Sequence, residues 1–337
     1  MPRLLLLATG DTLAQVRHSS PPRIADGAEL LTRVAAPEGT EVEDVRAEPS
    51  WDTSPGTQLL LARRARSALL DDGYDGVVVT HGLDTVEETA FLTDVLLGPA
   101  ADLGAVVFTG ATRCLDDPAT DGPINLAAAL TAAADPVTPG LGAVLCLDGE
   151  LHAARRAHLA DTTRSPSITS APHPRLGHIA SGRVVLTDKA PPRPPVITDL
   201  PETNVALVKT YPGMPTSLLT AVTDAGALGV VVEGTGRGNV PVELLMPIRE
   251  LLSWDIPVVV ASRAHSAGFD VVGGWEVASP AAGGPPGVLG MDAVDLAGRV
   301  GAISAGGLRP GQARVALMAA LASGGGVAAA RAYFAGL

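Results

Sequence analysis

Two threonine-containing segments carry the residues best suited to catalysis. The first, Ala8–Ala14 (ATGDTLA), follows an apolar run, Leu4–Ala8, that predicts a buried strand. A hydroxyl on a glycine-containing turn at a strand end lies at the edge where open α/β sheets bind ligands. Such a turn can expose a nucleophile and direct backbone N–H groups toward the reacting atom. Thr12 is therefore a candidate nucleophile, although a threonine here also serves as an ordinary turn or cap residue.

The second segment, Thr80–Ala90 (THGLDTVEETA), also lies between a predicted strand and a predicted helix. Asp84 stands beside the expected helix N-terminus, where a carboxylate either caps the helix or holds a substrate ammonium. Thr85, with Glu88 three residues later, has the spacing of a capping box. We expect both segments to lie on one edge of one sheet.

Short apolar runs alternate with helical patterns along the chain, which predicts βα units and a parallel sheet. The proline-rich stretch 189–203 is the predicted linker, because proline blocks helices and sheet ladders. We therefore expect an N-terminal domain of residues 1–188 and a C-terminal domain of residues 204–337. The predicted strands are 4–8, 76–80, 105–109, 142–147, 205–209, 229–233 and 257–262, and the predicted helices are 58–70, 87–97, 125–134, 218–225, 241–254 and, as the last, 312–322.

Together the two segments resemble the signatures of the bacterial L-asparaginase/glutaminase family, which read roughly ATGGTIA and THGTDTMEETA. The resemblance implies an α/β, two-domain fold with a larger N-terminal, mostly parallel sheet flanked by helices and a smaller C-terminal α/β domain. It also implies a homodimer or homotetramer that acts on a small-molecule amide. The likeness continues in the family's order at residues 108–113, 121–126, 150–155, 174–177, 211–213, 234–241 and 262–263.

The resemblance assigns roles to single residues of this chain. Thr12 corresponds to the catalytic nucleophile and Asp84 to the aspartate that holds the substrate ammonium. Ser50 corresponds to a serine that helps hold the substrate carboxylate, and the carbonyl of Ala111 to one that orients the amide. Asn239 corresponds to a residue that reaches a neighbouring subunit's site. The implied substrate-binding set is Ser50, Trp51, Gly82, Leu83, Ala111 and Asn239.

Several positions depart from the family pattern. Leu83 replaces the second catalytic threonine, and Leu159 aligns with a lysine in a segment that reads roughly DVTKTHTT. Trp51 replaces a glutamine, Asp11 replaces the second glycine of the first motif, and the loop 16–27 has no counterpart of the lid tyrosine. Replacing both members of a buried polar pair by apolar groups is nearly neutral for stability, so the double change indicates remodelling. The lost acid–base assistance is worth roughly 10²- to 10⁴-fold in rate.

Two interpretations remain open. In the first, the chain is an amidohydrolase that uses Thr12 on L-asparagine or on a modified, more apolar asparagine-like amide, because apolar groups have entered the pocket. The backbone N–H of Leu83 would still serve the oxyanion hole, and Thr12 would need another base. In the second, the chain is a weakly active or inactive homologue that acts as a binding protein. The candidate bases are Asp11, His18, His81 and His158.

The composition limits the partners. A net charge of −12 without a basic stripe disfavours nucleic acid. No run of about 18 apolar residues predicts a membrane span, and Arg3–Leu7 is too short for a signal peptide, so we expect a cytoplasmic protein. Cys114 and Cys146 are expected to be buried free thiols, and no ligand cluster at metal spacing implies a metal or an organic cofactor. A dinucleotide-dependent oxidoreductase is disfavoured because no GxGxxG leads from a strand into a helix.

Overall fold

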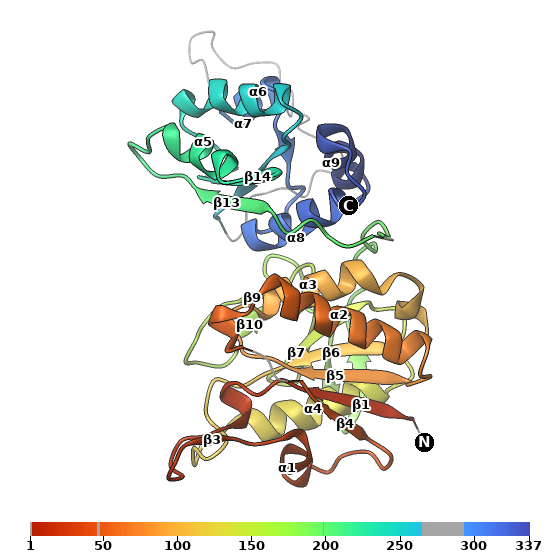
Figure 1. The fold of residues 1–337 in the computed structure, drawn as a ribbon. Helices are drawn as coiled ribbons and strands as arrows, with labels where there is room; N and C mark the ends of the chain where they lie inside the picture. Colours follow the sequence, from red (N-terminus) through yellow and green to blue (C-terminus); the bar gives the residue numbers. More distant parts are fainter. Residues whose placement is uncertain (1, 46–47, 198, 265–292) are drawn as a thin grey trace, which may run out of the picture. The chain divides into compact units, whose positions relative to one another are not determined.

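The chain divides into two compact units, Met1–Val196 and Ile197–Leu337, each an α/β structure (Figure 1). The computed structural model describes residues 2–45, 48–197, 199–264 and 293–337. The boundary between the units falls inside the proline-rich stretch 189–203, whose described residues form no helix or strand.

An eight-stranded sheet forms the centre of the first unit, in the order β12-β11-β8-β7-β6-β5-β1-β4. The prediction of a mostly parallel sheet is confirmed. Residues of β1, β5, β6 and β7 are buried along their whole length, as expected for parallel strands covered on both faces. The parallel strands are β1 (Leu4–Ala8), β4 (Glu41–Asp44), β5 (Gly76–Thr80), β6 (Ala105–Thr109) and β7 (Ala143–Leu147), and the antiparallel ones are β8 (Glu150–Ala153), β11 (Gly177–Ala180) and β12 (Arg183–Leu186).

Helices cover both faces of this sheet (Figure 1). α2 (Pro55–Leu70) and α3 (Val86–Leu97) pack on one face, and α1 (Gly27–Thr32) and α4 (Gly122–Ala134) on the other. Because strand side chains alternate between faces, consecutive leucines of β1 enter different cores: Leu4 and Leu6 pack toward α4, and Leu5 and Leu7 toward α2 and α3. Two apolar cores therefore hold the strand ends in fixed positions.

The order of the parallel strands places a topological switch point between β1 and β5. From β1 the chain crosses through α1 to β4 on one side, whereas from β5 it crosses through α3 to β6 on the other side. The loops that leave these two strands diverge, and open α/β sheets bind ligands in the crevice formed at such a point. The two motifs singled out in the sequence occupy these two loops.

The helix that connects β6 to β7 lies on the opposite face of the sheet from the helix that connects β5 to β6. Both β5–α3–β6 and β6–α4–β7 step in the same direction along the sheet, yet α3 and α4 lie on different faces. One of the two crossovers is therefore left-handed, which is rare, and β6–α4–β7 is the one that differs in hand from the three before it. This path lets Asn125 of α4 donate to the carbonyl of Gly110 (3.0 Å) and accept from the backbone N–H of Asp148 (2.9 Å).

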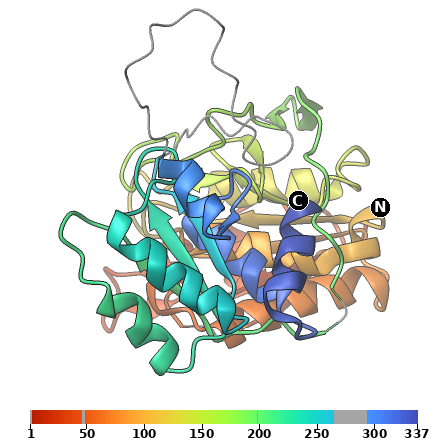
Figure 2. The ribbon, with the colours of Figure 1, turned by 90° about the horizontal axis from the view of Figure 1, so that it is seen from above.

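The second unit contains a parallel four-stranded sheet in the order β13-β14-β15-β16. Helices α5 (Ser217–Asp224), α6 (Leu245–Ser253) and α7 (Ala293–Arg299) contribute to the core on one face. α8 (Pro310–Ala320) packs on the other face with α9 (Gly326–Ala335) beside it (Figure 2). The strands are β13 (Val205–Lys209), β14 (Gly229–Gly234), β15 (Val258–Ser262) and β16 (Ile303–Ser304).

Some local predictions are wrong. Thr85 is the N-cap residue of α3, but no side-chain cap bond forms, because its hydroxyl donates to the carbonyl of Ser50 (2.7 Å). The helix predicted over 241–254 begins as a 3₁₀ turn, Val242–Leu244, before α6, and α9 follows the helix predicted to be the last. Cys146 is buried as expected, whereas Cys114 is only half-buried. None of the helices in the described ranges is long and apolar enough to cross a membrane.

The remaining short elements frame the site loops. β2 pairs with β3, and β9 pairs with β10, both antiparallel. They are β2 (Gln15–Val16), β3 (Arg23–Ile24), β9 (His158–Leu159) and β10 (Ile168–Thr169), together with the 3₁₀ turns Thr12–Ala14, Ser50–Asp52 and Gly98–Asp102.

Candidate active site

The loops that follow β1, β5 and β6 are tied together immediately behind the strand ends. The Thr9 hydroxyl donates to the carbonyl of Thr80 (2.6 Å), and the Thr9 N–H donates to the Thr80 hydroxyl (3.0 Å). The N–H of His81 donates to the carbonyl of Thr109 (2.8 Å). These bonds fix the starting points of the two loops that carry the sequence motifs.

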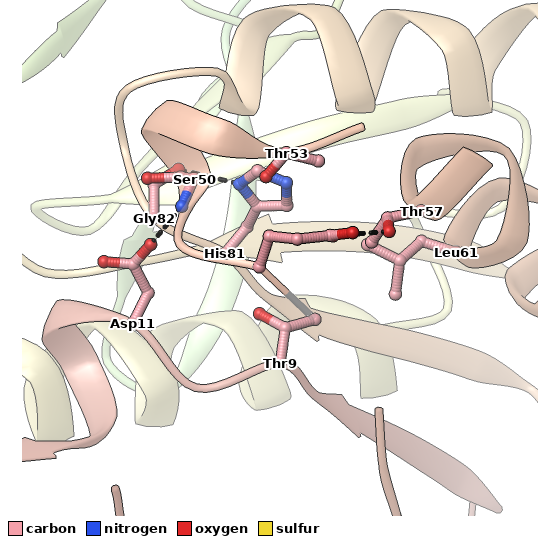
Figure 3. A pocket seen from close by; sticks show the side chains of 9 residues that line it. Thr9, Asp11, Ser50, Thr53, Thr57, Leu61, His81 and Gly82 are labelled. Carbon is pink, nitrogen blue, oxygen red and sulfur yellow. Dashed lines mark hydrogen bonds between the residues drawn. The ribbon is translucent and has the colours of Figure 1, made fainter. Parts of the chain in front are cut away.

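A chain of hydrogen bonds then joins Thr12 to Asp84 through Asp11 and Ser50. Oδ1 of Asp11 accepts from the Thr12 N–H (2.6 Å) and from the Thr12 hydroxyl (3.2 Å). Oδ2 of Asp11 accepts from the Ser50 N–H (2.7 Å), a bond drawn in Figure 3. The Ser50 hydroxyl in turn donates to Oδ2 of Asp84 (2.7 Å). The structure thus brings together three residues that the sequence assigned to the site, with Asp11 as the link between them.

The backbone conformation of Asp11 is a condition of this arrangement. Its φ of 63° and ψ of −164° lie in a region that is almost restricted to glycine and costs an L-residue on the order of 1–3 kcal/mol. The conformation persists because the carboxylate is held by three hydrogen bonds from Thr12 and Ser50. Asp11 therefore places a carboxylate on a turn whose backbone conformation is typical of glycine.

Gly82 provides the space for these contacts. A Cβ at this position would lie 2.1 Å from Oδ2 of Asp11 and 2.1 Å from Oγ of Ser50. Such distances are far inside van der Waals contact, so any side chain at Gly82 would displace both groups. The glycine of the second motif is required by this close approach.

Burial and hydrogen bonding act in opposite directions on the pKa values of Asp11 and His81. Burial raises the pKa of Asp11, but the hydrogen bonds from Ser50 and Thr12 outweigh burial and leave that pKa below its ordinary value. Burial lowers the pKa of His81, and the bond of its Nδ1 to the Gly82 carbonyl (2.7 Å) and the charges of Asp11 and Asp84 only partly oppose this. Because a carbonyl can only accept, Nδ1 carries the proton. At neutral pH the site therefore combines an ionised Asp11 with a neutral His81.

The pocket beside this network is narrow and polar. It lies beneath Ser50 and Gly82, between Asp11, His81 and the first turns of α2 (Figure 3). In this structure it is too narrow to admit a water molecule. Sequence reasoning missed several of its residues, although Glu48 stands only two positions before Ser50. The pocket is lined by Thr9, Asp11, Glu48, Ser50, Thr53, Thr57, Leu61, His81 and Gly82.

The apolar replacements lie outside this pocket. The Trp51 side chain is 70% exposed. Leu83 and Leu159 are partly buried and pack against the core beneath α2 and α3, and the N–H of Leu159 donates to Glu87 (2.7 Å). Packing of both leucines into one core agrees with a paired replacement of polar groups. An apolar substrate lining formed by Trp51, Leu83 and Leu159 stays a prediction.

The other assigned residues have different surroundings. Ala111 is buried at the end of β6, in the core on the α4 face. Asn239 belongs to the second unit, where Thr235 and Asn239 form an isolated antiparallel bridge. The side-chain oxygen of Asn239 is buried and has no hydrogen-bond partner among the residues that the structure describes. This glycine-rich turn closes on itself rather than opening a helix after β14, which also speaks against dinucleotide binding.

Of the four candidate bases, Asp11 is joined to the Thr12 hydroxyl by a hydrogen bond. His18 is exposed and pairs with Asp116 (3.0 Å). His158 is buried, with Nδ1 3.5 Å from the carbonyl of Arg156. Within the described part of the chain, no group of three or more His, Cys, Asp or Glu residues is arranged to hold a metal ion.

The fold and the site define a doubly wound α/β protein with a hydroxyl and two carboxylates at its switch point. Comparisons with known proteins agree with this class. Residues 3–192 match the family model "Asparaginase, N-terminal", and residues 204–334 match "Glutaminase/Asparaginase C-terminal domain". The chain belongs to the asparaginase family, whose members are amidohydrolases.

Individual relatives show how far the likeness extends. The chain is 30% identical to an L-asparaginase of Bacillus licheniformis over 78% of this chain and 82% of the relative. It is 27% identical to L-asparaginase 2 of Escherichia coli, over 95% of this chain and 89% of the relative. A crystal structure of a probable cytoplasmic L-asparaginase from Campylobacter jejuni covers all of both chains with a TM-score of 0.78 at 26% identity. The divergence therefore leaves the fold intact across both units.

Proposed function

We propose that this protein hydrolyses the side-chain carboxamide of L-asparagine or of a modified, more apolar asparagine-like compound, with Thr12 as the nucleophile. The observation that carries the proposal is the hydrogen bond from the Thr12 hydroxyl to the Asp11 carboxylate (3.2 Å) at the switch point of the sheet. A nucleophilic hydroxyl needs an adjacent base. Asp11 supplies one in a chain where Leu83 and Leu159 stand in place of the threonine and lysine of the family pattern.

The reaction follows from these positions. The Thr12 oxygen attacks the carboxamide carbon while its proton passes to Asp11. The C–N bond then breaks, and the proton on Asp11 goes to the leaving nitrogen, so that ammonia departs and an ester forms on Thr12. Water attacks this ester, gives its proton to Asp11, and the Thr12 oxygen leaves and recovers that proton. The sum is one carboxamide and one water converted to one carboxylic acid and one ammonia.

Asp84 holds the ammonium group of the substrate in this proposal. Its carboxylate is held by Ser50 through a 2.7 Å hydrogen bond, and the side chain is exposed to an incoming ligand. A fixed carboxylate attracts a substrate ammonium group and orients the carboxamide toward Thr12. The pKa of Asp11 lies below its ordinary value, which makes Asp11 a weak base. We therefore expect slower turnover than a base tuned to neutral pH would give.

The alternative is a binding protein with little or no activity. Leu83 and Leu159 in place of the family's threonine and lysine favour that alternative, because acid–base assistance is worth roughly 10²- to 10⁴-fold in rate. An assay of ammonia release distinguishes the hydrolase from the binding protein. It uses a panel of carboxamides that includes L-asparagine and L-glutamine. We expect turnover that falls at least about 10³-fold in Thr12→Ala. Thr32→Ala, which removes an exposed hydroxyl of α1, is the matched control and should leave the rate unchanged. Equal rates in wild type and Thr12→Ala would exclude the proposed nucleophile.

A homodimer or homotetramer in the cytoplasm belongs to the same proposal. Membership of the asparaginase family, whose members typically form oligomers, supports the assembly. The name of the Campylobacter jejuni relative supports the location. Light scattering on the purified protein tests the assembly, and a monomer at working concentrations would contradict it.

A further inference from the structure

The side chains around the Asp11 carboxylate, beside the Thr12 turn, carry negative charge and no positive charge. The pocket lining includes the carboxylates Asp11 and Glu48, and none of the nine lining residues is a lysine or an arginine. Asp84, joined to the lining residue Ser50, adds a third carboxylate at the same edge. An incoming carboxylate would meet like charges and no positive side chain among these residues.

The hydrogen-bond donors around Thr12 are already engaged by the protein's own carboxylates. The Ser50 N–H and the Thr12 N–H both donate to Asp11, and the Ser50 hydroxyl donates to Asp84. Backbone N–H groups of this kind would otherwise hold a substrate carboxylate. An anionic substrate could reach them only by displacing Asp11.

The Asp11 carboxylate is not easily displaced by a substrate anion. Hydrogen bonds keep its carboxylate ionised at neutral pH, because its pKa lies below the ordinary value despite burial. Its backbone occupies a glycine-like conformation, which fixes the direction of the side chain. Gly82 contributes only a hydrogen where a Cβ would collide with Asp11 Oδ2. The three hydrogen bonds from Thr12 and Ser50 thus hold the carboxylate in place, and Gly82 leaves the room that it occupies.

We propose that Asp11 acts as a built-in carboxylate that excludes free α-amino acids, and that the substrate is an asparagine-like amide whose neighbouring carboxyl group is esterified, amidated or absent. This inference rests on the proposed function and narrows its substrate class. Such an amide keeps the ammonium group that Asp84 attracts and lacks the carboxylate that Asp11 and Glu48 would repel. The expected preference over the free carboxylate is on the order of 10²-fold in kcat/KM.

The test compares L-asparagine with its α-methyl ester, with ammonia release as the readout because cleavage of the ester itself frees methanol. Both are assayed at a pH where both amines are protonated. The wild type should favour the methyl ester by on the order of 10²-fold, and Asp11→Asn should reduce that ratio at least about 10-fold. Because loss of the base slows both substrates alike, the ratio reports selectivity alone. Asp52→Asn removes an exposed carboxylate that does not line the pocket, from the 3₁₀ turn that carries Ser50, and it should leave the ratio unchanged.

A second measurement separates this inference from the proposed function. Calorimetric Kd values of the two compounds for Thr12→Ala report binding without turnover. A preference for the ester in Kd, with no turnover by the wild type, would retain the inference and refute the proposed hydrolysis. A preference for L-asparagine, an unchanged ratio in Asp11→Asn, or binding of neither compound would overturn the inference.

Discussion

Replacement of Gly82 by alanine should disable the site while leaving the fold in place. The added Cβ would lie 2.1 Å from Asp11 Oδ2 and from Ser50 Oγ, so each must retreat by about 1 Å or more to reach ordinary contact. That movement breaks the bonds from the Ser50 N–H to Asp11 and from the Ser50 hydroxyl to Asp84, both 2.7 Å long. A hydrogen bond to a charged group contributes about 1.5–3 kcal/mol, so a loss of roughly 3 kcal/mol in unfolding free energy is expected after partial relaxation.

The effect on catalysis should exceed the effect on stability. Asp11 Oδ1 orients the Thr12 hydroxyl, and a displacement of about 1 Å near reacting groups costs on the order of 10²-fold in rate. The assay is kcat/KM for ammonia release, with urea unfolding measured in parallel. Gly56→Ala is the matched control, because a Cβ there meets only Ser54 Oγ at 3.6 Å and the residue is exposed. A Gly82→Ala enzyme with wild-type kcat/KM and stability would refute the close approach on which the reasoning depends.

Three further predictions concern pH and positioning. If ionised Asp11 is the base, its lowered pKa places the acid limb of kcat/KM below the ordinary value of 3.8, whereas a limb near pH 6 would identify a histidine instead. Burial raises the pKa of Asp94 to about 6 from 3.8, so the folded state binds the extra proton and stability falls as pH rises through that interval. Asp94→Asn, which keeps an oxygen for the Ala143 N–H, should therefore gain roughly 2–3 kcal/mol over wild type between pH 4 and pH 8, and a pH-independent difference in urea unfolding would contradict this. Asn125→Ala leaves the Gly110 carbonyl and the Asp148 N–H without their partner and should lower the unfolding free energy by about 2–4 kcal/mol, with an unchanged value as the contrary result.

The sequence predicts the strands of the first unit well where burial is complete. β1, β5 and β6 match the predicted ranges residue for residue, because a short, continuous apolar run between turn-forming residues is typical of a buried strand. β4 (Glu41–Asp44) escaped prediction, since this edge strand is largely exposed and carries three acidic residues. β11 and β12 escaped for a similar reason, because the half-exposed strands of an antiparallel hairpin show little apolar periodicity.

The site could be predicted in part. The motifs supplied Thr12 and Asp84 and the family resemblance supplied Ser50, and the structure joins all three in one hydrogen-bonded chain. The link through Asp11 depends on a backbone conformation that its residue type disfavours, so no local preference could indicate it. The failure of Thr85 as a capping residue has the same origin, because a tertiary contact with Ser50 competes successfully for its hydroxyl.

The most direct test of the central claim is to look for an ester on Thr12 during turnover. Wild-type protein is mixed with excess of the best carboxamide, quenched in acid and digested, and the peptide that contains Thr12 is examined by mass spectrometry. The account predicts a fraction of that peptide heavier by the mass of the substrate less ammonia, and no such species in Thr12→Ala. An adduct on another residue, or steady ammonia release with no covalent species even after rapid quenching, would contradict it.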